Sequence, residues 1–313
     1  MVKLIFSLSL MAFVLYLADL EEFITAAANV SIIYLIMFAL LVYVDRALVV
    51  YKWNLLLIAR NVHVPFMHMF SLYSTAVLAG VVLPTTVGGD MFRVYDLKRR
   101  NISMKTSIAS IMVERALGFV CMLAIATIGL GVSVYLMSDS WAQFAGIVWA
   151  IIISVIMCVG FVLVLRNETF NTKLNEFSEK HGHRWGIGKI HDLYLYCRSY
   201  RNDVAVLVKV TFLTLIRQCV PILMNVTLVY AYGIEASFLE LVAIIPIIVL
   251  GTRLPISMDG IGVQEGLYVV LFGLVGISAS QALLMSITFR AMAMLSTLPF
   301  GIMYFYNYHT KKK

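Results

Sequence analysis

The most constraining feature of this 313-residue sequence is a series of apolar runs about as long as a lipid bilayer is thick. A helix that crosses a bilayer needs about 20 mostly apolar residues. Such runs occupy about residues 2–18, 29–51, 106–137, 141–165, 204–232 and 280–306. The chain is 61% hydrophobic and 13% charged, whereas soluble domains are about half apolar and a quarter charged. These observations exclude a soluble protein and predict one all-α integral membrane domain over residues 1–313.

Two further apolar regions, at about 66–97 and 237–277, are interrupted by proline and glycine. Each arm is too short to cross a bilayer comfortably by itself. Proline removes a backbone donor and glycine permits tight turns, so we expect both regions to be broken-helix hairpins. The hairpin-breaking residues are Gly80 and Pro84 in the first region, and Gly251 and Pro255 in the second.

The basic residues predict the orientation, because Lys and Arg collect on the cytoplasmic side of a membrane. Basic residues occur near the N-terminus, at 52–60, at 98–105, in the 166–203 segment and at 311–313. The links at 19–22 and 138–140, and the stretch around Glu235 and Glu240, lack them. This pattern predicts six spans, two re-entrant hairpins, a cytoplasmic loop at 166–203, and both termini on the cytoplasmic side of the inner membrane.

The two halves of the sequence also resemble each other. At a constant offset of 171 residues, Arg46 matches Arg217, and Gly89 matches Gly260. The sequence around Pro84 matches that around Pro255 at the same offset. Three crossings in each half would give the halves opposite orientations, so we expect an inverted repeat of residues 1–137 and 138–313.

Paired breaks at membrane depth indicate a binding site, because irregular backbone survives there only when it is buried in protein or lines a cavity. The second arm of each hairpin begins with free N–H groups at the positive end of a helix dipole, which attract an anion such as phosphate. The candidate backbone contacts are Gly88, Gly89, Ser257, Gly260 and Gly262.

Charged residues in or beside apolar segments strengthen this prediction, because an isolated charge at mid-bilayer costs at least about 2.5 kcal/mol. Arginine suits bidentate contact with phosphate. The candidate ligands are Arg46, Arg93, Arg217 and Arg253, followed by Arg115 and Arg290. Carboxylates that could pair with them or take up protons are Asp90, Glu114, Asp259 and Glu265.

Other kinds of site have little support in the sequence. The cysteines, Cys121, Cys158, Cys197 and Cys219, form no C-x-x-C pair, and the histidines match no metal site. The sequence contains no H-E-x-x-H, G-x-S-x-G or Asp-rich metal motif. We therefore expect no catalytic residues, no metal, no cofactor, no nucleic-acid partner and no enzymatic activity.

The residues Leu83-Pro84-x-x-x-Gly88-Gly89-Asp90-x-x-Arg93, with Pro255-x-Ser257-x-x-Gly260-x-Gly262-x-x-Glu265 downstream, form a specific pair of motifs. The pair resembles the lysylphosphatidylglycerol synthase transmembrane region, also called a flippase-like domain, over nearly the whole chain. Large members of that family join this region to a soluble aminoacyl-transfer domain, which we do not expect here. Asp259 is a departure, because a small residue is expected at its position.

The resemblance implies a stand-alone flippase or scramblase for an anionic phospholipid or a polyprenyl-phosphate-linked substrate. It also implies membrane lipids as partners, and glycosyltransferases or lipid-modifying enzymes of the cell envelope as neighbours. The residues alone indicate only an anion site within the membrane. They leave open an ion-coupled transporter of a small anionic solute, a membrane-embedded transferase, and an accessory subunit of glycolipid synthesis.

Overall fold

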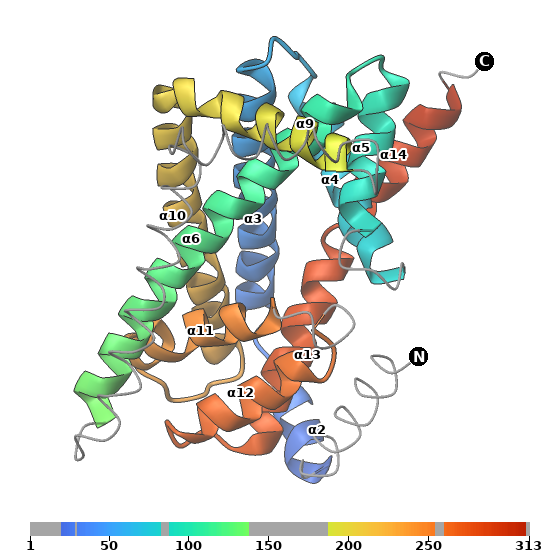
Figure 1. Cartoon of the computed structure of the whole chain (residues 1–313). Helices are drawn as coiled ribbons and strands as arrows, with labels where there is room; N and C mark the ends of the chain where they lie inside the picture. Colours follow the sequence, from blue (N-terminus) through green and yellow to red (C-terminus); the bar gives the residue numbers. More distant parts are fainter. Residues whose placement is uncertain (1–19, 29, 83–87, 138–186, 254–259, 311–313) are drawn as a thin grey trace.

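The computed structural model describes residues 20–28, 30–82, 88–137, 187–253 and 260–310. Within these ranges all regular secondary structure is helical, and no strand occurs. Four described stretches are long and apolar enough to cross a membrane: Ile32–Ile58, Met104–Gly129, Val204–Ala231 and Ala279–Tyr304. The chain is therefore an α-helical membrane protein with several spans (Figure 1).

The long helices form where the apolar runs predict them. They are α3 (Ile32–Ile58), α6 (Met104–Met137), α10 (Val204–Ala231) and α13 (Ala279–Leu295), and α13 is followed by α14 (Leu298–Thr310). The run expected as one helix at 280–306 is thus interrupted at Ser296 and Thr297. Pro299 follows in the first turn of α14, where its missing N–H is tolerated. Helices α3 and α10 pack along each other.

The two expected broken regions are each occupied by a pair of short helices. The first pair is α4 (Phe66–Val82) and α5 (Gly88–Arg99), and the second is α11 (Phe238–Thr252) and α12 (Val263–Gly273). The partners within each pair pack against each other. Figure 1 shows α4 and α5 in the upper part of the molecule and α11 and α12 in the lower part. The turns at 83–87 and 254–259 lie outside the described residues.

A close backbone approach explains one of the expected glycines. A Cβ atom on Gly89, near the start of α5, would lie 2.5 Å from the carbonyl oxygen of Ala76 in α4. No real Cβ contact is that short, so the two helices can meet at this point only through glycine. Gly260 has a different requirement, because its φ of +74° is the left-handed conformation that favours glycine.

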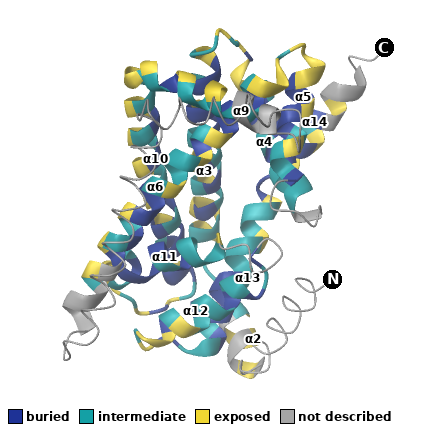
Figure 2. Cartoon of the chain, in the orientation of Figure 1, coloured by how far each residue is buried: buried dark blue, intermediate teal, exposed yellow. Residues whose placement is uncertain are grey.

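Helix α3 contributes to two large apolar cores and, through Leu56, to a smaller third core. Phe38 and Val42 belong to a core shared with α10, α11, α12 and α13. Trp53 and Leu57 belong to a second core shared with α4, α5, α6 and α14. Figure 2 shows buried residues in both parts of the molecule, and α11 is buried along much of its length. The segment of α3 between Val42 and Val50 connects the two cores.

Two peripheral α-helices and one short 3₁₀ helix complete the described fold. Residues expected to form an outer link belong instead to α2 (Leu20–Ala28). Helix α9 (Ile187–Ser199) and the short 3₁₀ helix η1 (Tyr200–Asn202) occupy the described part of the 166–203 segment. Helix α9 packs against α6 and lies across the top of the molecule in Figure 1.

Candidate functional site

The segment of α3 between the two cores carries charges at the middle of the helix. Asp45 is thirteen residues from each end of α3 (Ile32–Ile58). Arg217 of α10 (Val204–Ala231) is thirteen residues from the start of its helix and fourteen from the end. At a rise of about 1.5 Å per residue, both positions lie about 20 Å from the helix ends. Both side chains therefore lie near mid-depth of spanning helices.

Asp45 joins the two long helices through arginine. The Nε atom of Arg217 lies 2.9 Å from Asp45 Oδ1, and Nη2 of Arg217 donates a 3.4 Å hydrogen bond to Oδ2. Arg46 Nη1 also reaches Oδ2 at 3.4 Å. The Asp45 side chain is only 8% exposed. One buried carboxylate thus holds both arginines that the repeat aligned, Arg46 and Arg217.

A second group of charges joins α5 to α6. Arg93 donates to Glu114 at 2.9 Å and to Asp90 at 3.2 Å. Its guanidinium carbon lies 3.9 Å from the ring centroid of Trp53, a cation–π contact. Arg115, whose side chain is 58% exposed, forms an ion pair with Asp90. Arg93 is therefore fixed by two carboxylates and an indole, whereas Arg115 remains accessible.

Arg253, at the end of α11, is the residue of the second short-helix pair that interacts with these charges. It interacts electrostatically with Arg217, Asp45 and Arg115. Its side chain is exposed, and no carboxylate of the described residues lies within ion-pair distance. Arg253 is therefore the guanidinium here that is most available for a ligand.

Lys52 of α3 is a further buried cation of this region. It is 2% exposed, donates to Thr214 at 3.1 Å, and interacts with the charges of Glu114, Arg217 and Asp45. We name the whole group the central cluster. Its basic members are Arg46, Lys52, Arg93, Arg115, Arg217 and Arg253, and its acidic members are Asp45, Asp90 and Glu114.

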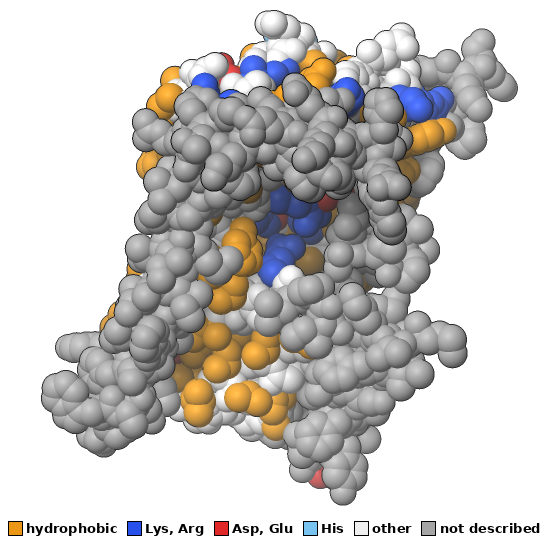
Figure 3. All heavy atoms as spheres, viewed as in Figure 1, with side chains coloured by type: hydrophobic (Ala, Val, Ile, Leu, Met, Phe, Trp, Pro, Cys, Tyr) orange, Lys and Arg blue, Asp and Glu red, His pale blue; other side chains and the backbone are white. Residues whose placement is uncertain are grey.

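The central cluster has more positive than negative charge. Its six basic and three acidic side chains leave three positive charges in excess among the described residues. Buried Nε atoms of Arg46 and Arg93 also have no acceptor within the described ranges. Figure 3 shows Lys and Arg side chains gathered in a hollow at mid-height, with apolar side chains below it on the same face. This arrangement can bind an anion.

Glu265 and Arg290 form a separate pair. Arg290 Nε of α13 donates to Glu265 of α12 at 3.1 Å, and Glu265 is fully buried. Glu265 also accepts the Gly262 N–H at 2.7 Å and so caps α12. The arrangement is a charge-swapped counterpart of Arg93 and Glu114, because the acid here lies on the short helix. Arg290 is thus engaged away from the central cluster, unlike the other candidate arginines.

The structure places the remaining expected residues as follows. Gly88 and Gly89 begin α5, and Gly262 precedes α12 with a φ of +81°. Gly80 and Gly251 lie in the first arms of the two pairs. A Cβ on Gly251 would meet the flexible side chain of Leu267, and one on Gly80 would make only an ordinary contact. Pro84, Pro255, Ser257 and Asp259 lie outside the described residues.

Two cluster members, Asp45 and Lys52, are absent from the candidates that the sequence suggests. The signal for Asp45 is its place beside Arg46 within an apolar run. An acid and a base at mid-span must pair or contact water. For Lys52 the corresponding signal is weaker, because a lysine near a helix end can extend to the membrane surface.

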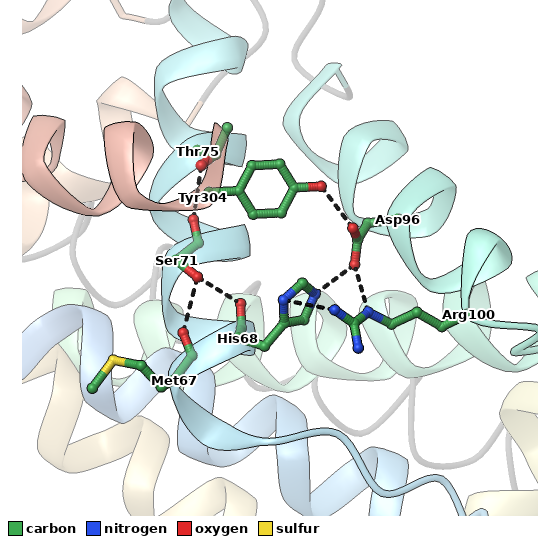
Figure 4. Close-up of polar contacts among 7 residues, drawn as sticks. All are labelled: Met67, His68, Ser71, Thr75, Asp96, Arg100 and Tyr304. Carbon is green, nitrogen blue, oxygen red and sulfur yellow. Dashed lines mark hydrogen bonds and ion pairs between the residues drawn. The ribbon is translucent and has the colours of Figure 1, made fainter. Parts of the chain in front are cut away.

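A polar network lies at the end of the molecule where α5 meets α14, outside the four spanning stretches except for Tyr304 (Figure 4). Tyr304 donates to Asp96 at 2.6 Å, and His68 contacts the same carboxylate at 2.7 Å. Arg100 bonds His68 at 2.9 Å and lies 3.4 Å from Asp96. Burial raises the pKa of Asp96, but the hydrogen bonds from His68 and Tyr304, together with electrostatic attraction to His68 and Arg100, outweigh it and hold the pKa below its usual value.

The described residues contain no group of His, Cys, Asp and Glu side chains that could hold a metal ion. Cys121, Cys197 and Cys219 form no disulfide with one another.

Comparison with known proteins adds a family to this geometry. A search of curated proteins finds no match. Residues 1–301 match the family described as the lysylphosphatidylglycerol synthase TM region, whose name relates it to membrane lipids. The match covers nearly all of the 313 residues and includes every helix of the central cluster. The chain therefore belongs to the lysylphosphatidylglycerol synthase transmembrane-region family.

Proposed function

We propose that this protein is a lipid flippase or scramblase, and that it moves an anionic phospholipid or a polyprenyl-phosphate-linked substrate across the cytoplasmic membrane. The headgroup phosphate would bind the arginines of the central cluster and backbone amides of the short-helix pairs. The observation that carries the proposal is the excess of positive charge at mid-depth of spanning helices. Such charge is costly in a membrane and is typical of a substrate pathway.

The surroundings of the central cluster favour a lipid over a small solute. In Figure 3 the basic hollow and a group of apolar side chains share one face of the molecule. An amphiphile could place its headgroup in the hollow while its tails remain against apolar surface. A small anionic solute has no apolar tails to place against these side chains.

The arrangement of the helices supports transport rather than covalent chemistry. We propose that the two short-helix pairs are re-entrant hairpins of an inverted repeat, because each pair consists of helices too short to span. Their positions in opposite parts of the molecule suit a site reached alternately from the two sides. The basic end, with Arg60 and Lys98, would face the cytoplasm.

The proposal can be tested with purified protein in liposomes that contain fluorescent phosphatidylglycerol. A membrane-impermeant reductant reports the fraction of labelled lipid in the outer leaflet. Arg217→Gln and Arg253→Gln should abolish translocation, because each removes a cation from the central cluster. Lys98→Gln is the matched control, since Lys98 is exposed at the basic end.

Native mass spectrometry of the same variants separates binding from transport. We expect the native protein and Lys98→Gln to retain phosphatidylglycerol and Arg253→Gln to lose it. Unchanged lipid binding and translocation in both arginine variants would overturn the proposal. Uptake of glycerol phosphate without lipid movement would instead favour the solute transporter.

A further inference from the structure

We propose that the central cluster selects a headgroup with at least two negative charges, a phosphate monoester or a diphosphate, over a singly charged phosphodiester and over an aminoacylated lipid. This inference rests on the proposed function and specifies its substrate class. The carrying observation is the charge balance of the described side chains at mid-span.

The positive charges of the cluster outnumber the negative charges that oppose them. Three carboxylates, Asp45, Asp90 and Glu114, face five arginines and Lys52. Even without Lys52, two guanidinium charges remain unopposed. Uncompensated charge is expensive in a medium of low dielectric constant. A dianion brings the cluster closer to neutrality than a monoanion does.

Every carboxylate of the cluster already has an arginine partner. Asp45 contacts Arg46 and Arg217. Asp90 contacts Arg93 and Arg115, and Glu114 contacts Arg93. The ammonium group of an aminoacylated headgroup would therefore find no free acid among the described residues of the cluster. It would instead meet arginines, and like-charge contacts of this kind are strongly unfavourable.

The cations of the cluster differ in how accessible they are to a ligand. Arg93 and Lys52 are buried and engaged. Arg253 is exposed, and the side chain of Arg115 is 58% exposed. The charges of Arg253 and Arg115 repel each other, and Arg253 forms no ion pair with a carboxylate of the described residues. A doubly charged phosphate placed between them would relieve their mutual repulsion.

The test compares two lipids that differ by one charge and little else. Phosphatidic acid ends in a phosphate monoester, and phosphatidylmethanol is its methyl phosphodiester with a single negative charge. Short-chain forms of both, with lysyl-phosphatidylglycerol as a third probe, would be titrated against the full-length protein in nonionic detergent at pH 7.5. The second proton of a phosphate monoester leaves near pH 6. We expect phosphatidic acid to bind at least about tenfold more tightly than phosphatidylmethanol, and lysyl-phosphatidylglycerol to bind most weakly.

Charge reversal at Arg253 tests the cause of the preference. Arg253→Glu lowers the excess charge of the cluster by two, so the preference for phosphatidic acid should disappear. Lys98→Glu makes the same change at the basic end and should leave the preference intact. Arg253 is exposed and forms no described ion pair, so its replacement should leave the fold unchanged.

The outcomes separate this inference from the proposed function. Equal binding of the two phosphate lipids, or tight binding of lysyl-phosphatidylglycerol, would overturn the inference and leave an anionic-lipid carrier in place. A preference that survives Arg253→Glu would show that the charge balance is not its cause and would also overturn the inference. Binding of none of the three lipids would overturn both.

Discussion

At the scale of single residues, the structure assigns different physical roles to positions that look equivalent in the sequence. Gly89 and Gly260 match at the repeat offset. Gly89 is required by contact with the backbone of Ala76, and Gly260 by its positive φ. The same residue type is thus kept for a steric reason in one half and for a conformational reason in the other.

This difference predicts the effect of alanine at Gly89. A Cβ there would lie 2.5 Å from a backbone oxygen that cannot move away cheaply. We expect Gly89→Ala to destabilise the protein by about 1–3 kcal/mol, the usual cost of overpacking. Thermal unfolding in detergent would measure the change.

Gly118→Ala is the control, because a Cβ on Gly118 within α6 meets nothing within 4 Å. Alanine there should be neutral or stabilise the helix by up to about 1 kcal/mol. Equal losses of stability in both variants would contradict the close approach of α4 and α5.

The sequence predicts the arginines of the site better than their partners. Arg46 and Arg217 stand out because they match in the two halves and lie in apolar runs. Their shared partner Asp45 lies 172 residues before Arg217, and no local pattern indicates which distant helix faces it. The four described spans follow from run length alone, and the runs at 2–18 and 141–165 lie outside the described residues. The break at Ser296 could not be placed from the sequence, because the apolar run continues through the interruption between α13 and α14.

At the scale of helices, buried ion pairs tie each short-helix pair to the following long helix. Arg93 of α5 pairs with Glu114 of α6, and Glu265 of α12 pairs with Arg290 of α13. In the first ion pair the arginine lies on the short helix, and in the second ion pair the glutamate does. Each pair has one almost fully buried member, so removing the partner leaves an uncompensated buried charge.

A double-mutant cycle on Glu265 and Arg290 tests this coupling. Arg290→Met leaves the fully buried Glu265 carboxylate without the guanidinium that pairs with it. We expect a loss of about 3–5 kcal/mol, as is typical when one partner of a buried pair is removed. The second change, Glu265→Gln, can still accept from the Gly262 N–H and should recover part of that loss in thermal unfolding. Additive effects of the two changes would show that the pair is not coupled.

The contact between α5 and α14 gives a second prediction at this scale. Tyr304→Phe keeps the ring against Phe92 but removes the hydrogen bond to Asp96. Hydrogen bonds to charged groups contribute about 1.5–3 kcal/mol, and we expect a loss of that size in thermal unfolding at pH 7. No loss would show that the hydroxyl does not stabilise the carboxylate.

The lowered pKa of Asp96 fixes the pH dependence of this stabilisation. A carboxyl whose folded-state pKa lies below its unfolded value stabilises the protein above the unfolded value, near pH 4. The contribution is lost as the pH falls through the lowered folded-state pKa. The stability deficit of Asp96→Asn should therefore shrink as the pH falls below about pH 4.

At the scale of the whole molecule, charge and architecture agree. Basic residues such as Lys98 and Arg201 lie at the end of the molecule that carries α9, and Glu235 lies in the turn between α10 and α11. The sequence predicts the first group inside the cell and the second outside, because Lys and Arg near helix ends mark the cytoplasmic side.

Cysteine labelling in intact cells tests this orientation. In a variant without the four native cysteines, Ser103→Cys and Glu235→Cys place single thiols at exposed positions beside α6 and α10. An impermeant maleimide should label Glu235→Cys directly and Ser103→Cys only after permeabilisation. The opposite pattern would reverse the proposed topology.

The pairing of Arg93 with Glu114 also constrains how the protein is assembled during synthesis. Helix α5 carries Asp90, Arg93 and Asp96 and cannot enter lipid alone without exposing these charges. Glu114, whose carboxylate pairs with the buried Arg93, lies 21 residues later in the chain, on α6. When the ribosome has completed α4 and α5, their partner has not yet left it. In the proposed re-entrant arrangement, the pair therefore stays at the membrane surface, or beside an insertion factor, until α6 leaves the ribosome.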